Sequence, residues 1–96
     1  MTIATAPNVA AMLQLSESDL WREALASLLR EKKRQILQLR LEILSRYGVG
    51  SIEELETAIE LGEVGEHPTW EDLIVAENLG LRLEEIDVHL ADLRRA

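Results

Sequence analysis

Residues 16–48 read SESDLWREALASLLREKKRQILQLRLEILSRYG, a stretch without proline and without glycine before its last position. Ser16 and Asp19 stand at the spacing of a capping box, in which a short polar side chain accepts the backbone N–H three residues later. Gly48 is the expected stop, because glycine readily takes the left-handed conformation that ends many helices. Leu, Glu, Ala and Arg dominate the stretch between them and favour helix. We therefore predict one long helix over residues 17–47.

Residues 37–43 offer one competing interpretation, since their apolar and polar side chains alternate as in a half-buried strand. The residues involved are good helix formers, however, and no turn signals flank them. Helix is therefore the favoured prediction for this segment as well.

Two further helices follow from similar signals. Ser51-Ile-Glu-Glu54 is a second capping box, and the helical pattern after it lasts until Gly62. This predicts a short helix over residues 52–61. Thr69 is expected to cap a last helix over residues 70–95.

The N-terminal residues 1–15 are different, with low polarity and no clear period. Asn8 could cap a short turn over residues 9–13, but a flexible tail and a loosely docked segment are both open. The sequence thus divides into this N-terminal tail and a helical hairpin domain over residues 16–96, because a chain of 96 residues leaves no room for a second domain.

The two long predicted helices carry matching apolar seams, with spacings that alternate between four and three residues as in a two-stranded coiled coil. The seam residues are Leu25, Leu29, Ile36, Leu39 and Ile43 in the first helix, with Trp21, Leu28 and Tyr47 on the same side, and Ala76, Leu79, Leu83, Ile86, Leu90 and Leu93 in the last. A connection of about 22 residues makes the helices antiparallel. The predicted fold class is all-α: a long antiparallel two-helix hairpin, coiled-coil-like, with a short helix in the connection.

Lys32 interrupts the first seam. The antiparallel register places residues 84–87, with three carboxylates, near it, so that a salt bridge could fix the register. A lysine whose ammonium group reaches water is the favoured interpretation, because burying an unpaired charge is costly.

Each long helix also carries a second apolar row, set apart from its seam. The rows are Leu37, Leu41 and Leu44 in the first helix and Trp70, Ile74, Leu81 and Val88 in the last. One interpretation makes them extra core under the short helix or the tail. The other, which we favour, makes them a partner or dimer interface, since uncovered apolar rows mark interaction sites. A homodimer would then complete a four-helix bundle.

The net charge of −8 is unevenly placed along the chain. Residues 1–47 carry seven Lys/Arg and five Asp/Glu, whereas residues 48–96 carry three and thirteen. Pairing of a basic helix with an acidic one, within the fold or across a dimer, is the simplest explanation. The functional interpretation is an acidic surface that meets a basic partner protein, because such fields speed encounters and suppress wrong partners.

A basic cluster in the first helix raises the alternative of nucleic-acid contact through Arg30, Lys33, Arg34 and Arg40. Such cations could neutralise phosphates. The chain is strongly acidic, however, and no helix-turn-helix, zinc-finger or stacking-aromatic motif accompanies the cluster. A solvated helix face is the default interpretation, and nucleic acid is the less favoured partner.

The sequence offers few candidate catalytic residues. The chain has no cysteine and two histidines, His67 and His89, neither at the spacing of a metal-binding pair. No nucleotide-binding or nucleophile-elbow motif is present. We therefore expect no enzymatic activity, no metal and no cofactor. No apolar run approaches the roughly 20 residues that span a bilayer, and the N-terminus is unlike a signal peptide, so we expect a soluble protein of the cytoplasm without membrane contact.

Three segments around the turn carry a resemblance to known proteins: Ser45-Arg-Tyr-Gly48, Ser51-Ile-Glu-Glu-Leu55 and Gly65-Glu-His-Pro-Thr-Trp-Glu-Asp-Leu73. In this layout, residues 28–95 resemble a group of small prokaryotic helical-hairpin proteins, either uncharacterised or antitoxin-like. The resemblance implies a long hairpin with a short helix in the turn, an interaction role and no catalytic residues. In an antitoxin-like protein, that role would be to mask a basic or apolar surface of a partner.

Overall fold

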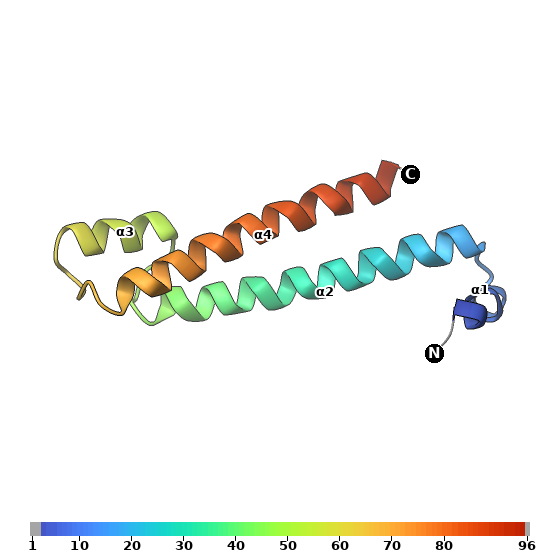
Figure 1. Ribbon diagram of the computed structural model, residues 1–96, viewed down its shortest axis with the longest axis horizontal. Helices are drawn as coiled ribbons and strands as arrows, with labels where there is room; N and C mark the ends of the chain where they lie inside the picture. The colour runs from blue at the N-terminus through green and yellow to red at the C-terminus, as the bar shows by residue number, and fades with distance from the viewer. Residues whose placement is uncertain (1–2, 96) are drawn as a thin grey trace.

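The computed structural model describes residues 3–95, and all the secondary structure in this range is helical, which confirms the predicted all-α class (Figure 1). The elements are a 3₁₀ turn η1 (Ile3–Thr5) and the helices α1 (Ala6–Leu13), α2 (Glu17–Ser45), α3 (Ile52–Glu60) and α4 (Thr69–Arg95). The bounds predicted for the three later helices differ from these by at most two residues. Residues 1–2, the start of the predicted tail, and residue 96 lie outside the described range.

Serine side chains cap α2 and α3, as predicted. Ser16 Oγ accepts a hydrogen bond from the backbone N–H of Asp19 at 3.0 Å, and Ser51 Oγ accepts one from Glu54 at 3.1 Å. The Glu54 carboxylate in turn accepts the N–H of Gly50 at 2.8 Å, one residue before the cap. Backbone donors that the helix leaves unpaired at these two ends therefore find partners within the same few residues.

The other two predicted helix-end signals have different outcomes. Gly48, just after α2, takes a φ of 67°, which confirms it as the stop. Thr69 was expected to cap α4 but is its first residue. The Pro68 carbonyl already accepts hydrogen bonds from the N–H groups of Glu71 and Asp72, at 3.1 and 3.2 Å, so the helix starts one residue earlier than predicted.

The N-terminal segment forms a helix of its own. α1 begins three residues before the turn considered from the sequence, with Pro7 near its start, where a missing backbone donor is harmless. Asn8 therefore lies inside the helix and does not cap it. Gln14 ends α1 with a φ of 59°, and the Leu15 N–H donates to the Ala10 carbonyl at 2.9 Å. α1 folds back beside the first turns of α2, at the end of the molecule remote from α3 (Figure 1).

The helices α2 and α4 lie side by side and antiparallel, forming an elongated hairpin of 59 × 27 × 17 Å (Figure 1). The seam cluster between them consists of Ile36, Leu83 and Ile86, flanked by Leu29, Leu79 and Leu90. The turn-end cluster consists of Leu44, Leu55, Ile59 and Leu73, flanked by Tyr47, Val49, Ile52 and Val64. Neither cluster includes a residue before Leu29, and toward their free ends the two helices diverge.

The face that α2 turns toward α4 differs in part from the predicted seam. The buried and half-buried positions at spacings of three and four are Ala26, Leu29, Lys33, Ile36, Arg40 and Ile43. Leu25 and Leu39, predicted in the seam, are 48% and 51% exposed, so that part of the prediction is wrong. Two contacts explain why α2 is rotated about its axis relative to the prediction. Leu44 belongs to the turn-end cluster, and Lys33 pairs with Asp87 of α4. Both contacts draw this side of α2 toward its neighbours.

Candidate functional site

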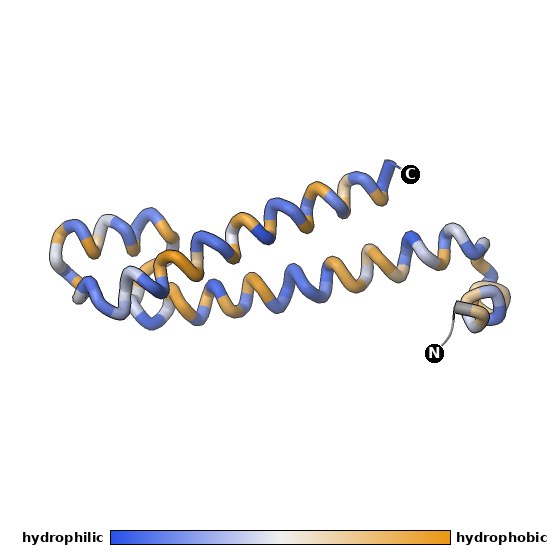
Figure 2. Tube along the Cα trace, viewed as in Figure 1, coloured by the Kyte–Doolittle hydropathy of each residue, from blue (hydrophilic) through white to orange (hydrophobic). Residues whose placement is uncertain are grey.

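The outer face of α4 carries the row predicted to be a partner interface. We call Trp70, Ile74, Leu81 and Val88 the outer row; their exposed fractions lie between 43% and 59%. Glu77 and Glu84 are also exposed, and they fill the intervening positions at spacings of three and four residues. The outer row therefore combines apolar side chains with carboxylates. Figure 2 shows that hydrophobic positions recur along α4 almost to its end.

The matching row on α2 is shorter than predicted. Leu37 and Leu41 are exposed, whereas Leu44 is only 5% exposed because it packs against Leu55 and Ile59 of α3. Leu44 is thus a core residue, which agrees with the alternative that placed this row under the short helix. The predicted interface on α2 reduces to Leu37 and Leu41.

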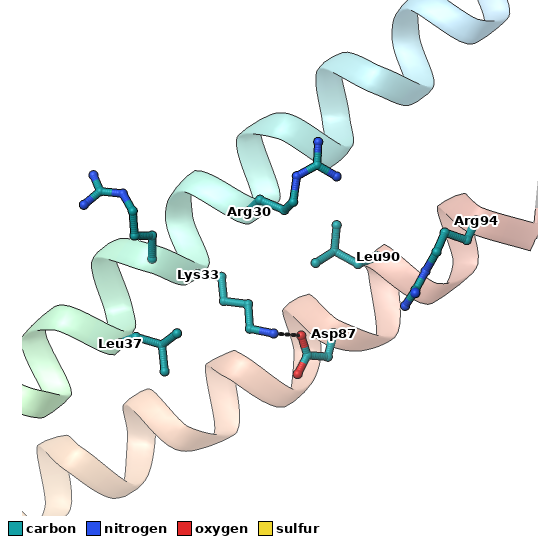
Figure 3. Close-up of a pocket in the computed structure, with 7 residues that line it drawn as sticks. Arg30, Lys33, Leu37, Asp87, Leu90 and Arg94 are labelled. Atoms are coloured by element: carbon teal, nitrogen blue, oxygen red, sulfur yellow. Dashed lines mark hydrogen bonds and ion pairs between the residues drawn. The ribbon is translucent and has the colours of Figure 1, made fainter.

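A groove of about 640 Å³, which we call the basic groove, runs between α2 and α4. Its lining residues are Arg30, Lys33, Arg34, Leu37, Asp87, Leu90 and Arg94. Figure 3 shows Arg30, Lys33 and Leu37 entering from α2, with Asp87, Leu90 and Arg94 entering from α4. The structure thus brings together three of the four cations predicted for nucleic-acid contact. It adds Arg94, which sequence reasoning missed because only the hairpin brings the end of α4 near Arg30.

Lys33 and Asp87 form an ion pair between the two long helices, with Nζ and Oδ1 2.6 Å apart. From the sequence, we expected residues 84–87 to lie near Lys32 and considered a salt bridge to that lysine. Lys32 is exposed, and the neighbouring lysine makes the contact. Partly solvated pairs of this kind contribute up to about 1 kcal/mol. The pair connects Lys33 in the middle of α2 to Asp87 of α4 at one level of the hairpin.

The other cations of the basic groove differ in how they are paired. Arg34 donates two hydrogen bonds to the Glu31 carboxylate, from Nη2 at 2.6 Å and from Nε at 3.0 Å. This contact raises the pKa of Arg34 and lowers the pKa of Glu31. Arg30 donates one long hydrogen bond, of 3.4 Å, to Ser27 Oγ. Arg30 and Arg94 therefore supply most of the positive charge that the groove offers to a ligand.

Arg40, the fourth cation predicted for nucleic-acid contact, does not line the basic groove. It is half-buried on the side of α2 that faces α4, and its Nε atom is buried without a hydrogen-bond partner in the described part of the chain. The predicted set of four cations is thus not brought together as one surface.

Two adjoining grooves of about 320 and 460 Å³ lie on the opposite flank of the hairpin and share Leu29. Besides the shared Leu29, five leucine side chains line them, which we call the leucine flank: Leu25, Leu28 and Leu39 of α2, with Leu79 and Leu93 of α4. At about 100° per residue, Leu28 and Leu39 follow one side of Ile36, whereas Arg30 and Leu37 follow the other. The two grooves are also lined by Lys32, Gln35, Arg82, Glu85, His89 and Asp92, so this flank combines leucines with polar and charged side chains.

Sequence reasoning missed the leucine flank because it assigned Leu25 and Leu39 to the hairpin seam. The signal was nevertheless present. One series of spacings of four and three comprises Trp21, Leu25, Leu28, Lys32, Gln35 and Leu39. The series that faces α4 runs one residue later along the same helix. Two such adjacent series are typical of a helix that packs between two neighbours.

The histidines and carboxylates give no candidate metal centre. Within residues 3–95, no three His, Asp or Glu side chains are grouped so that they could hold a metal ion. His67 Nδ1 lies 2.8 Å from Glu71 Oε1 at an exposed position near the start of α4, and exposed His89 lines one of the grooves of the leucine flank. None of the helices in the described range has both the length and the apolar character that crossing a bilayer requires.

Comparison with known proteins shows to which family the chain belongs. No curated protein and no solved structure matches it. A family model does match, and the match covers residues 1–96. The chain therefore belongs to the uncharacterized protein MJ0235 family.

Proposed function

We propose that this protein is a non-enzymatic interaction module that binds a partner protein through the outer row of α4. The observation that carries the proposal is the outer row itself, four large apolar side chains that stay exposed along one side of a regular helix. Large apolar side chains exposed among polar groups in this way are typical of binding sites. Leu37 and Leu41 of α2 are exposed as well, but Leu37 lines the basic groove.

The charge around the outer row indicates the chemistry of the partner. α4 carries seven Asp/Glu and three Arg, and Glu77 and Glu84 stand within the row. A partner that presents apolar side chains among Lys and Arg would match it, and the opposite charges would speed the encounter. Masking such a basic or apolar surface is what an antitoxin-like protein would do. We expect this interaction to take place in the cytoplasm.

The test is capture of the partner on the tagged protein, followed by reconstitution with the purified partner. Leu81→Glu and Val88→Glu should each raise the Kd at least about tenfold, because each places an unpaired carboxylate in an apolar contact. Leu61→Glu is the matched control, since Leu61 is an exposed leucine outside the outer row. Wild-type affinity in both outer-row variants would refute the proposed surface.

A second candidate function, binding of nucleic acid, is favoured by the basic groove, where Arg94 joins Arg30, Lys33 and Arg34. Carboxylates within or beside the groove already pair with Lys33 and Arg34, which weakens this candidate. Fluorescence anisotropy with labelled duplex DNA and single-stranded RNA at low salt tests it. Salt-dependent binding that Arg30→Glu abolishes would support it, and the absence of binding would refute it.

A further inference from the structure

The hairpin exposes more surface than a compact protein of the same mass. Its accessible surface is 6919 Å², whereas a compact monomer of 10.8 kDa exposes about 5,500 Å². The radius of gyration, 19.2 Å, likewise exceeds the roughly 12.5 Å of a compact chain of this length. A standard protein interface covers about 800 Å² on each partner. The excess surface is therefore large enough for one stable interface.

Part of this exposed surface lies on the leucine flank, where both long helices contribute leucine side chains. Leu25, Leu28 and Leu39 are 48%, 55% and 51% exposed, although they line two adjoining grooves between α2 and α4. Trp21 continues the same series toward the open end of the hairpin, where neither core cluster reaches. A hairpin whose two helices both present leucines beside such grooves has the shape of half a four-helix bundle.

We propose that a second copy of this chain packs its leucine flank on the leucine flank of the first, completing a four-helix bundle. The dimer face differs from the sequence prediction, which used Leu37, Leu41, Leu44 and the outer row. No residue of the outer row lines the two grooves of the leucine flank, so the proposal does not rest on the proposed function.

Charge selects how the second copy is oriented. α2 carries six Lys/Arg and five Asp/Glu, whereas α4 carries three and seven. Packing α4 on α4 would bring two acidic helices together, but packing α2 on α4 of the second copy joins a slightly basic helix to an acidic one. The bundle axis then runs parallel to the long axis of each hairpin. All neighbouring helices are antiparallel, as in most four-helix bundles.

This orientation also sets which residues meet. A two-fold axis parallel to the helices leaves each residue at the same position along the bundle axis. Residues of α2 and α4 that lie side by side within one hairpin are therefore also level with each other across the dimer. Leu28 and Leu93 line the same groove and stand at about the same height. Leu28 of one copy is therefore placed opposite Leu93 of the other. Lys32 and Glu85 line the second groove, and across the dimer they bring opposite charges to one level.

The first test is the molar mass in solution, measured by sedimentation equilibrium. We expect the wild-type chain to have twice the mass of 10.8 kDa. Leu28→Glu and Leu39→Glu should each raise the dimer Kd by about 100-fold, because the dimer would bury an unpaired carboxylate in an apolar contact. Helical content measured by circular dichroism should stay unchanged, since both side chains are half exposed in the single chain.

Leu41→Glu provides the matched control, because Leu41 is equally exposed on α2 but lies off the leucine flank. It should leave the dimer intact. A wild-type chain that is monomeric at all concentrations would overturn the proposal, and so would a dimer that Leu41→Glu dissociates and Leu28→Glu does not. Loss of the dimer in Leu28→Glu with undiminished partner binding leaves the proposed function intact and separates the two tests.

The second test addresses the orientation and uses the absence of cysteine from the sequence. Single variants Leu28→Cys and Leu93→Cys, carrying different tags, are co-expressed and oxidised. A mixed disulfide between the two variants supports α2 packed on α4 of the second copy. A disulfide of Leu28→Cys with itself, or no disulfide at all, overturns this orientation.

Discussion

Tyr47 and Asp72 join the end of α2 to the first turn of α4. The Tyr47 hydroxyl donates to the Asp72 carboxylate, which also lies 3.6 Å from Arg46 Nη1. The hydrogen bond to Asp72, and in second place burial, raises the pKa of Tyr47 above its ordinary value of 10. The folded state therefore favours the protonated phenol. This contribution to stability is complete below pH 10 and is lost as the pH rises through the raised pKa.

Tyr47→Phe should lower the free energy of unfolding at neutral pH by about 1 kcal/mol, because it removes the hydrogen bond and leaves the carboxylate with Arg46. It should also reduce the loss of stability above pH 10. Urea unfolding measured between neutral pH and about pH 11 compares the two proteins. Wild type and variant with the same alkaline slope would contradict the assigned role.

Arg40 differs from Tyr47, because one of its polar atoms is buried without a hydrogen bond that offsets the loss of water. Its Nε atom is buried without a partner in the described part of the chain. Arg40→Met keeps a long apolar stem and removes the unpaired donor, so it should raise the free energy of unfolding by about 1 kcal/mol. Thermal denaturation gives the sign, and a lower Tm in the variant would show that the guanidinium stabilises the fold.

At the scale of elements, the glycines of the chain have opposite roles. Gly80 lies inside α4, and a Cβ built on it would have nothing within 4 Å. Gly48 instead takes a φ of 67°, which side chains rarely adopt. Gly80→Ala should therefore raise the free energy of unfolding by about 0.5–1 kcal/mol, and Gly48→Ala should lower it by a similar amount. Thermal unfolding of both variants checks the pair, and a shift of the same sign in both would contradict it.

Local signals predicted the elements well. Ser16, Ser51 and Gly48 act within a few residues of where they stand, so their effect on helix ends follows from the sequence alone. Thr69 was misplaced by one residue because the carbonyl of Pro68 accepts the first hydrogen bonds of α4. These successes and this error concern only neighbours along the chain.

The rotation of α2 was not predictable in the same way. Leucine or isoleucine recurs on several sides of this helix, so its spacing is compatible with more than one face toward α4. The observed face depends on contacts between residues that are remote in sequence, such as Leu44 with Leu55 and Lys33 with Asp87. For that reason the residues of the leucine flank were assigned to the predicted seam, whereas the outer row, predicted to be an interface, is exposed in the single chain.

At the scale of the whole molecule, the hairpin is well packed at its turn end and open at the other. The turn-end cluster is built from α2, α3, α4 and the loops between them, whereas Trp21, Leu25 and Leu28 lie beyond both clusters. Stability within one chain is therefore expected to be uneven, because local opening is easiest where few apolar contacts hold the helix. A second copy on the leucine flank would stabilise the open end.

Hydrogen exchange of the backbone amides in residues 21–29 is the sharpest check on a dimer through the leucine flank, because it reports protection at the site where the second copy should pack. Wild type and Leu28→Glu are compared at the same protein concentration, with residues 52–59 of the turn end as an internal reference. If the second copy packs there, residues 21–29 are strongly protected in the wild type and lose this protection in Leu28→Glu, while residues 52–59 stay protected in both. Equally weak protection of residues 21–29 in the two proteins would contradict this packing.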